Sequence, residues 1–262
     1  MQTVTVAIPT IGREETLPAV LNAIAFQSHP VDELIILDEA KKPIAENFAI
    51  NQAMDLLSLQ GTRVVLLRER RKNGIGNARY RLCGEARNNI VLQVDDDVVL
   101  RPDCLARLLY SGSRVPWVVP TCVLVPGFFA LDGYLDTVVD PDDPRVTKWT
   151  SKYPWFIPYY RYSVPVVRDI ECAGTQCILL DRSSVLSLCE ALQGMGRLPR
   201  EDTYLTAKLG PGRFVSEAEC LHYEHPNQTD RSNWGTAMFY RLHEMAMEDP
   251  DHFVASVSKG ER

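Results

Sequence analysis

Short apolar runs alternate with segments of helical periodicity along the first 125 residues of the chain. The runs are rich in β-branched residues, and the segments between them repeat apolar residues every three to four positions. Because the runs are apolar throughout, we expect a mainly parallel central sheet that helices cover on both faces. The expected strands are residues 4–8, 34–37, 63–67, 90–94 and 117–119, and the expected helices are residues 14–26, 44–57, 75–86 and 102–110.

This alternation stops between residues 126 and 168. The stretch holds six prolines and ten of the chain's 22 aromatic residues. Further strands are expected at 177–180 and 213–216, and further helices at 183–192, 201–209 and 233–247. We therefore predict a single α/β domain over residues 1–262, in which residues 1–125 form one half and residues 126–262 form a second half with an aromatic-rich insertion at 126–168.

Composition and charge narrow the class of protein. The 262 residues are 45% hydrophobic and 24% charged, and the net charge of −6 argues against a nucleic-acid or anionic-membrane surface. No apolar run reaches the roughly 18 residues of a membrane span, and the N-terminus lacks the pattern of a signal peptide. Seven cysteines form no C-x-x-C pair, which favours free thiols. We expect a soluble cytoplasmic protein.

Three consecutive aspartates, Asp95, Asp96 and Asp97, follow the apolar run at 90–94. In an open α/β sheet, ligands bind beyond the carboxyl ends of the strands. On an extended backbone Asp95 and Asp97 would share one side while Asp96 points away. Such a carboxylate pair suits Mg²⁺ or Mn²⁺, whose remaining ligands are usually water and substrate phosphates. The alternative is a solvated acidic turn at the end of a strand.

Several further motifs stand in a fixed order along the chain. Pro9-Thr10 ends the first expected strand, Asp38 ends the second, and "GIGNAR" at 74–79 opens the helix before the aspartates. Together these motifs resemble the family 2 glycosyltransferases, which have the GT-A fold. The stretch "REDTYLTAKLGPGRFVSEAECLH" resembles the family's Glu-Asp helix, followed by a strand and a histidine. The resemblance covers about residues 4–112 well and residues 170–222 more loosely.

The resemblance implies a site for a nucleotide sugar and a divalent cation. Asp97 would be the main ligand of Mn²⁺ or Mg²⁺, and His222 a further one. Many family members have asparagine where this chain has Tyr80, which leaves that contact open. The expected nucleotide is UDP, with GDP or dTDP as alternatives. The implied nucleotide-binding residues are Pro9, Thr10, Asp38, Arg79, Asp95 and Asp96.

The resemblance also implies the chemistry of transfer. Asp202 matches the residue usually assigned as the base that deprotonates the acceptor, and Glu201 would orient acceptor or base, which implies inversion at the anomeric carbon. Acids are also favoured at a helix start by the helix dipole alone. Retention stays open. The acceptor is expected to be a small molecule or saccharide with a hydroxyl or amine.

The acceptor site is expected in the second half of the chain. Trp149 and Trp155 of the aromatic stretch would stack on the acceptor, or pack over the sheet edge instead. The turn with Gly174 and Thr175 lies where family members often have a turn of small residues near the acceptor, so the resemblance implies that these two residues bind the acceptor.

Two other functions remain open. A nucleotidyltransferase of sugar phosphates would usually show a Gly-rich basic loop after the first strand, whereas "PTIGREETL" has one glycine. A non-catalytic sugar-nucleotide-binding protein would not need Asp97, Asp202 and His222 intact.

Overall fold

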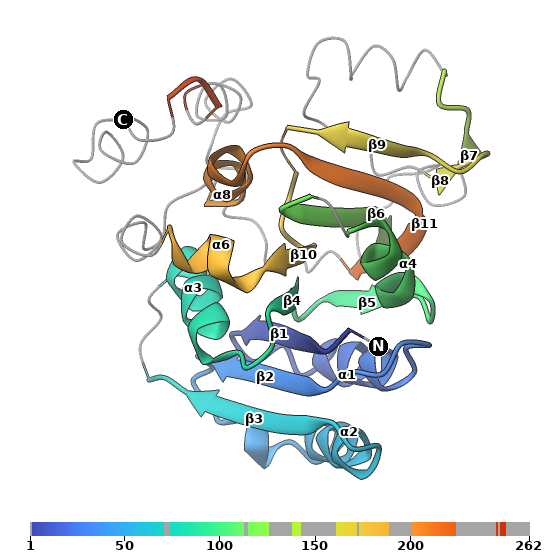
Figure 1. The fold of residues 1–262 in the computed structure, drawn as a ribbon. Coiled ribbons are helices and arrows are strands. Elements are labelled where there is room, and N and C mark those ends of the chain that lie inside the picture. The colour runs from blue at the N-terminus through green and yellow to red at the C-terminus, as the bar shows by residue number, and fades with distance from the viewer. Residues whose placement is uncertain are drawn as a thin grey trace.

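The expected strands and helices assemble around one mixed sheet in the computed structural model (Figure 1). Among the described residues the sheet has nine strands, in the order β3-β2-β1-β4-β10-β6-β11-β5, with β9 pairing to β11. This arrangement confirms the predicted α/β fold class. The structure describes residues 2–70, 74–112, 115–125, 138–142, 161–171, 173–188, 201–223, 245 and 247–249.

The first half of the sheet is parallel. Here β1 pairs with β2 on one side and with β4 on the other, and β2 pairs with β3. Thr10 lies opposite Asp38, so the ends of β1 and β2 are level. The carboxyl ends of these strands therefore form one edge. The four strands are β1 (Val4–Thr10), β2 (Glu33–Asp38), β3 (Arg63–Arg68) and β4 (Ile90–Val94).

The second half of the sheet adds antiparallel pairs. Strand β10 runs antiparallel to both β4 and β6, while β11 runs parallel to β6 and antiparallel to β5 and β9. Outside the large sheet, β7 (Val138–Val139) pairs with β8 (Arg161–Tyr162). The strands of this half are β5 (Val98–Leu100), β6 (Trp117–Val125), β9 (Val167–Ile170), β10 (Cys177–Asp181) and β11 (Gly212–Tyr223).

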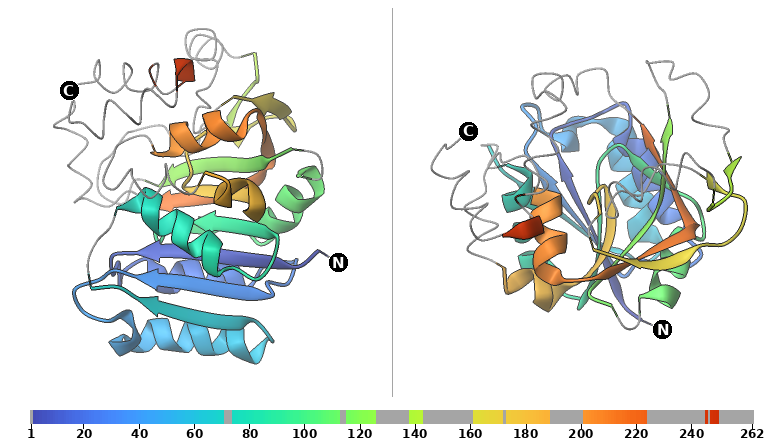
Figure 2. Two further views of the ribbon diagram at one scale, coloured as in Figure 1. Left: turned by 60° about the vertical axis from the view of Figure 1, so that its left-hand side comes forward. Right: turned by 90° about the horizontal axis from the view of Figure 1, so that it is seen from above.

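Helices pack on both faces of the sheet, as the uninterrupted apolar strands predict (Figure 2). Neighbouring residues of a strand enter opposite cores, because side chains alternate along extended backbone: Ile36 packs in one core and Leu37 in the other. The first core lies under α1 (Leu17–Ala25), α2 (Phe48–Leu59) and α4 (Cys104–Ser111), and the second under α3 (Ile75–Glu85), α6 (Arg182–Leu186) and α8 (Glu201–Leu209).

Local chemistry moves several element boundaries from their predicted places. The expected helix at 44–57 is divided into a short 3₁₀ turn, Ile44–Glu46, and α2, because the Asn47 side chain caps α2 by accepting from the Ala49 and Ile50 backbone N–H groups. The expected strand at 213–216 continues to Tyr223 through an irregularity between Val215 and Glu219.

Two predictions can be compared with the structure only over the residues that it describes, namely the C-terminal helix and the absence of a membrane span. The expected helix at 233–247 lies almost wholly outside these residues. Among the residues that the structure describes, no helix is long and apolar enough to cross a membrane.

Candidate functional site

Candidate site residues gather at the carboxyl edge of the parallel strands. Thr10 ends β1 and is buried, and Pro9 precedes it in the strand, opposite Leu37. The three aspartates follow β4 directly and form the turn into β5, which the Val98 N–H closes by donating to the Asp95 carbonyl at 3.1 Å. The sequence-predicted nucleotide residues of three strands thus meet at one edge.

Asp96 and Asp97 share one arginine, Arg13. Its Nη1 atom lies 2.5 Å from Asp96 Oδ1 and 2.6 Å from Asp97 Oδ2. The Thr10 hydroxyl donates to Asp96 Oδ2 at 2.6 Å, and Thr16 donates to the Asp96 carbonyl at 2.8 Å. The expectation that Asp96 points away from Asp97 is therefore wrong, because the aspartates form a turn and not an extended strand.

Gly12 lets the loop after β1 bring Arg13 to the aspartates. Its backbone has φ of +91°, a conformation that glycine adopts without steric cost, and its N–H donates to the Thr10 hydroxyl at 3.0 Å. A Cβ on Gly12 would lie 2.6 Å from the Cβ of Ala40. Arg13 is not among the site residues predicted from the sequence, although an arginine directly after a glycine at the end of a strand was the available signal.

Asp95 binds a different arginine, Arg79 of α3. Arg79 Nη2 lies 2.9 Å from Asp95 Oδ1, and Arg79 Nη1 donates to the Thr175 carbonyl at 2.9 Å. The Asp95 N–H donates to the Gln176 carbonyl at 2.8 Å. The structure thus brings Arg79, Asp95 and the predicted turn at Gly174 and Thr175 together, although these residues are far apart in the sequence.

His222 reaches the aspartates from β11. It lies opposite Val98 of β5, and its Nε2 atom is 3.5 Å from Asp97 Oδ1. Both side chains are buried, at 3% and 1% exposure. Burial opposes the imidazolium, but the proximity of Asp97 and Cys122 outweighs it and raises the pKa of His222 to about 10. The pair of residues that the resemblance assigns to the metal is therefore in direct contact.

The three carboxylates differ in how strongly they hold a proton. Burial raises the pKa of Asp96 to about 6, against the opposing effects of Arg13 and the Thr10 hydroxyl. Burial also raises the pKa of Asp95, with Arg79 opposing it. For Asp97, burial is outweighed by His222 and Arg13, which lower its pKa. Asp97 is thus the carboxylate held most firmly as an anion, as a metal ligand has to be.

Asp38 has partners of its own at the end of β2. Its Oδ1 atom accepts from the Ala40 N–H at 2.9 Å and lies 2.7 Å from Arg68 Nη1, while Oδ2 accepts from the Ile44 N–H at 3.1 Å. A carboxylate offers about four acceptor positions, of which the described residues fill three, and the side chain itself is only 1% exposed.

Other predicted residues make no hydrogen bond or ion pair to this cluster among the described residues, or lie outside those residues. Asp202 stands in the first turn of α8, where its carboxylate accepts from the Thr203 N–H at 2.7 Å. Among the described residues no hydrogen bond or ion pair joins Asp202 to the aspartate turn. Glu201 is the first residue of α8. Trp149 and Trp155 lie outside the described residues.

Asp97 and His222 fit a divalent cation as a two-donor site only once His222 has lost its proton, because a histidine ligand has to be neutral and the pKa of His222 is about 10. Ligands at cis positions of a cation with bonds of about 2.1 Å lie about 3 Å apart, close to the 3.5 Å between Asp97 Oδ1 and His222 Nε2. The described residues contain no group of three or more His, Cys, Asp or Glu side chains arranged to hold a metal. The remaining ligands would thus have to be water and a bound diphosphate.

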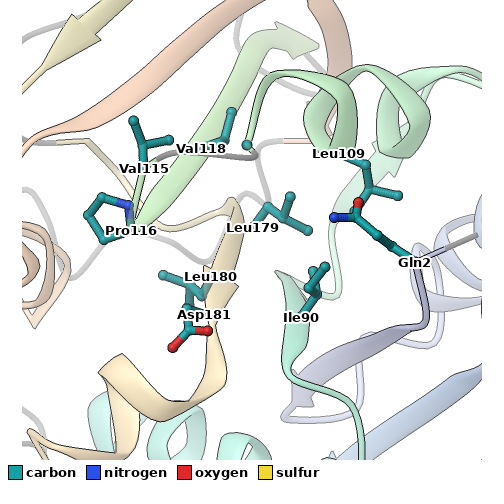
Figure 3. Close-up of a pocket in the computed structure, with 10 residues that line it drawn as sticks. Gln2, Ile90, Leu109, Val115, Pro116, Val118, Leu179, Leu180 and Asp181 are labelled. Carbon is teal, nitrogen blue, oxygen red and sulfur yellow. The ribbon is translucent and has the colours of Figure 1, made fainter.

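A cavity of about 320 Å³ lies apart from this site (Figure 3). It is lined by residues at the start of β4, the end of β10 and the beginning of β6, including Ile90, Asp181 and Val118. Because Ile90 begins β4 and the aspartates follow its last residue, the cavity lies at the opposite end of that strand.

One protein-family model matches the first part of the chain. The model described as "Glycosyl transferase family 2" matches residues 5–114, which run from β1 through α4. This segment contains Thr10, Arg13, Asp38, Arg79 and the aspartate turn. The resemblance to family 2 glycosyltransferases is confirmed over these residues. No curated protein sequence matches the chain.

Solved structures share the fold. The chain is similar to GalNAc-T7 solved with UDP, GalNAc and Mn²⁺, with a TM-score of 0.64 and 14% identity over 100% of this chain and 53% of that one. It is also similar to residues 1–349 of TarS from S. aureus, solved with UDP-GlcNAc, with a TM-score of 0.59 and 14% identity over 97% of this chain and 71% of that one. The chain thus spans about half the length of the GalNAc-T7 chain. These matches confirm the GT-A fold.

Proposed function

We propose that the chain is a metal-dependent, inverting glycosyltransferase that moves a sugar from a nucleoside diphosphate to a hydroxyl or amine of a small molecule or saccharide. One observation carries the proposal. The aspartate turn lies at the carboxyl edge of the parallel strands, inside a segment that matches a glycosyltransferase family. Asp97 of this turn lies 3.5 Å from His222, which comes from outside the segment. UDP is the proposed nucleotide, because the structures of GalNAc-T7 and TarS were solved with UDP or a UDP-sugar.

Donor binding is assigned to the strand ends. Asp38 has three partners among the described residues, and its fourth acceptor position is assigned to a hydroxyl or N–H of the nucleoside, for which the residues covering this buried side chain would have to move. Thr10 and Arg79 hold Asp96 and Asp95 in fixed orientations, so the edge is ordered before the donor arrives. Because these side chains are already held in place, little of the free energy of donor binding is lost in reorganising the site.

The leaving group has to be stabilised as the bond to the sugar breaks. A divalent cation held by Asp97 and His222 would supply positive charge to the departing diphosphate. The buried carboxylate of Asp97 stays ionised beside His222 and Arg13, which keeps it available as a ligand. Burial limits competition from water for that carboxylate.

Acceptor activation is assigned to α8 and the turn at Gly174 and Thr175. Asp202 is proposed to accept the proton of the attacking hydroxyl, with Glu201 orienting the acceptor or the base. The backbone of the 174–176 turn is tied to Arg79 and Asp95, so an acceptor resting on this turn would lie next to the donor site. A single direct attack on the anomeric carbon, in which the acceptor oxygen or nitrogen replaces the departing nucleoside diphosphate and gives its proton to Asp202, inverts that carbon.

The change Asp202→Asn tests this assignment. Transfer from a UDP-sugar should fall by about 10²- to 10⁴-fold, the usual contribution of general base catalysis, while UDP binding should stay close to that of the wild type. Steady-state kinetics with UDP-GlcNAc and UDP-GalNAc, together with calorimetry for UDP, measure both. The exposed Asp55 of α2, changed to asparagine, is the control and should leave both unchanged. A fully active Asp202→Asn enzyme would remove Asp202 from the mechanism.

A further inference from the structure

Arg13 has a place in the site that the proposed function leaves unexplained. One oxygen of Asp97, Oδ2, faces Arg13 at 2.6 Å, and the other, Oδ1, faces His222 at 3.5 Å. The same arginine nitrogen also holds Asp96 at 2.5 Å. Arg13 thus binds the proposed metal ligand through the oxygen that does not face His222.

Arg13 carries a permanent charge in a nearly closed environment. Its side chain is 20% exposed, while Asp96 and Asp97 are 4% and 1% exposed. Burial opposes that charge, but the three aspartates outweigh it and raise the pKa of Arg13 above its ordinary value. The guanidinium offsets the repulsion between two adjacent buried carboxylates when nothing else is bound.

This charge affects any cation that binds Asp97. A divalent cation on Oδ1 would lie a few ångströms from the guanidinium on Oδ2, where like charges repel strongly in a poorly hydrated site. A cation alone should therefore bind weakly. A diphosphate brings negative charge that attracts both the cation and Arg13.

The guanidinium also has donors to offer. Arg13 uses Nη1 for both carboxylates, and the described residues give its Nε and Nη2 atoms no hydrogen-bond partner. An arginine can bind phosphate oxygens with two parallel N–H groups. The same side chain can therefore keep the aspartates in place and contact a diphosphate.

We propose that Arg13 is a positioning residue that couples cation binding to diphosphate binding. It neutralises Asp96 and Asp97 in the ligand-free protein, disfavours a cation that arrives alone, and stabilises the site once cation and diphosphate are both present. The inference rests on the proposed function, because it takes the ligands to be a divalent cation and a nucleoside diphosphate.

Calorimetric titration of Mn²⁺, with and without saturating UDP, tests the coupling. Wild type should bind Mn²⁺ at least about tenfold more tightly when UDP is present, a coupling of about 1.4 kcal/mol. Arg13→Gln should bind Mn²⁺ alone about tenfold more tightly than wild type, and UDP should then tighten Mn²⁺ binding by a smaller factor. Unchanged or weaker binding of Mn²⁺ alone by Arg13→Gln would overturn the inference.

Three further variants separate charge from packing. Arg13→Lys keeps the positive charge and should bind Mn²⁺ alone as weakly as wild type; binding as tight as that of Arg13→Gln would overturn the electrostatic explanation. Adding Asp97→Asn to Arg13→Gln should abolish the gain, and a retained gain would place the cation elsewhere. Arg107→Gln, which removes an arginine with 39% exposure paired to Asp103 and Glu217, should change neither titration.

The same titrations distinguish failure of this inference from failure of the proposed function. If wild type binds UDP with Mn²⁺ but Arg13→Gln shows the same coupling, only the role of Arg13 is wrong. If wild type binds UDP neither alone nor with Mn²⁺, the proposed function is wrong and the inference is overturned with it.

Discussion

Gly12 shows how one residue controls the geometry of the candidate site. Its φ of +91° turns the chain immediately after β1, so that Thr10 and Arg13, on either side of it, both contact Asp96. Ala40, just beyond the end of β2, fills the space where a side chain on residue 12 would project. Both the backbone conformation and the close approach therefore require glycine.

Gly12→Ala should destabilise the protein and weaken UDP binding. A non-glycine residue at this φ costs about 1 to 3 kcal/mol, and the new Cβ would also press on Ala40 at 2.6 Å, displacing Arg13. Chemical denaturation and UDP calorimetry measure the two effects. Gly61→Ala is a matched control, because Gly61 has φ of +93° but no atom within 4 Å of its Cβ position. Equal losses in both variants would show that the contact with Ala40 does not matter.

The sequence predicts the types of site residue better than their partners. Thr10, Asp38 and the aspartates lie at one edge of the sheet, because parallel strands end together, and Arg79 reaches that edge from α3. Arg13 was not predicted as a site residue, because two glutamates follow it in "GREE" and balance its charge. The sequence alone does not show which of these charged side chains points into the protein. The predicted orientation of Asp96 was wrong, because side chains alternate along a strand but not in a turn.

At the scale of elements, the caps of two helices allow a test of pH dependence. Asp181 ends β10 and caps α6, accepting from the Ser184 N–H at 2.9 Å and from the Ser183 hydroxyl at 2.5 Å. Burial opposes the carboxylate, but these hydrogen bonds lower the pKa of Asp181 below its ordinary value. Asn47 caps α2 in the same way without a charge.

Asp181→Ala should cost about 1 kcal/mol of unfolding free energy at pH 7, as loss of a helix cap usually does. Because the folded-state pKa is depressed, this stabilisation is present above the ordinary aspartate pKa and is lost as pH falls through the folded-state value. The difference from wild type should therefore shrink in acid. Denaturant unfolding from pH 7 to acid measures it. Asn47→Ala should show a loss that does not change with pH, and a loss at Asp181 that is also constant would contradict the role of its charge.

Element identity was predictable where local pattern decides it. The bounds of β4 and α8 match the prediction, since each is a short segment with a clear start and end. Strand β5 was not predicted, because three acids precede its three residues, and β11 extends beyond residue 216, where the predicted strand ends. Both strands are stabilised by pairing with each other, a contact between segments more than a hundred residues apart that periodicity does not reveal.

At the scale of the molecule, two halves of the chain build one site. Residues 5–114 provide the strand ends and the aspartates, while His222 comes from β11 and the 174–176 turn comes from the loop before β10. The antiparallel pairing of β10 with β4 and of β11 with β5 makes the two halves share one sheet. The family match ends at residue 114, yet the proposed metal pair joins residues 97 and 222.

The proposed acceptor site also uses the second half of the chain, because it includes the aromatic-rich stretch at 126–168. Trp149→Ala and Trp155→Ala should each raise the KM for the acceptor and leave UDP binding unchanged, because sugar and flat organic surfaces stack on indole rings. Acceptor kinetics and UDP calorimetry, alongside thermal unfolding, separate the possibilities. A loss of stability with an unchanged acceptor KM would indicate packing instead.

The most direct test of the account is calorimetric binding of UDP with and without Mn²⁺ to wild type and to Asp97→Asn, with the half-exposed Asp103→Asn as control. GDP and dTDP titrations on wild type set the nucleotide preference. The account predicts that wild type and Asp103→Asn bind UDP tightly only with Mn²⁺, and that Asp97→Asn loses this metal-dependent binding. Binding that ignores both Mn²⁺ and Asp97 would reduce the three aspartates to an acidic turn and contradict the proposed metal-dependent transfer.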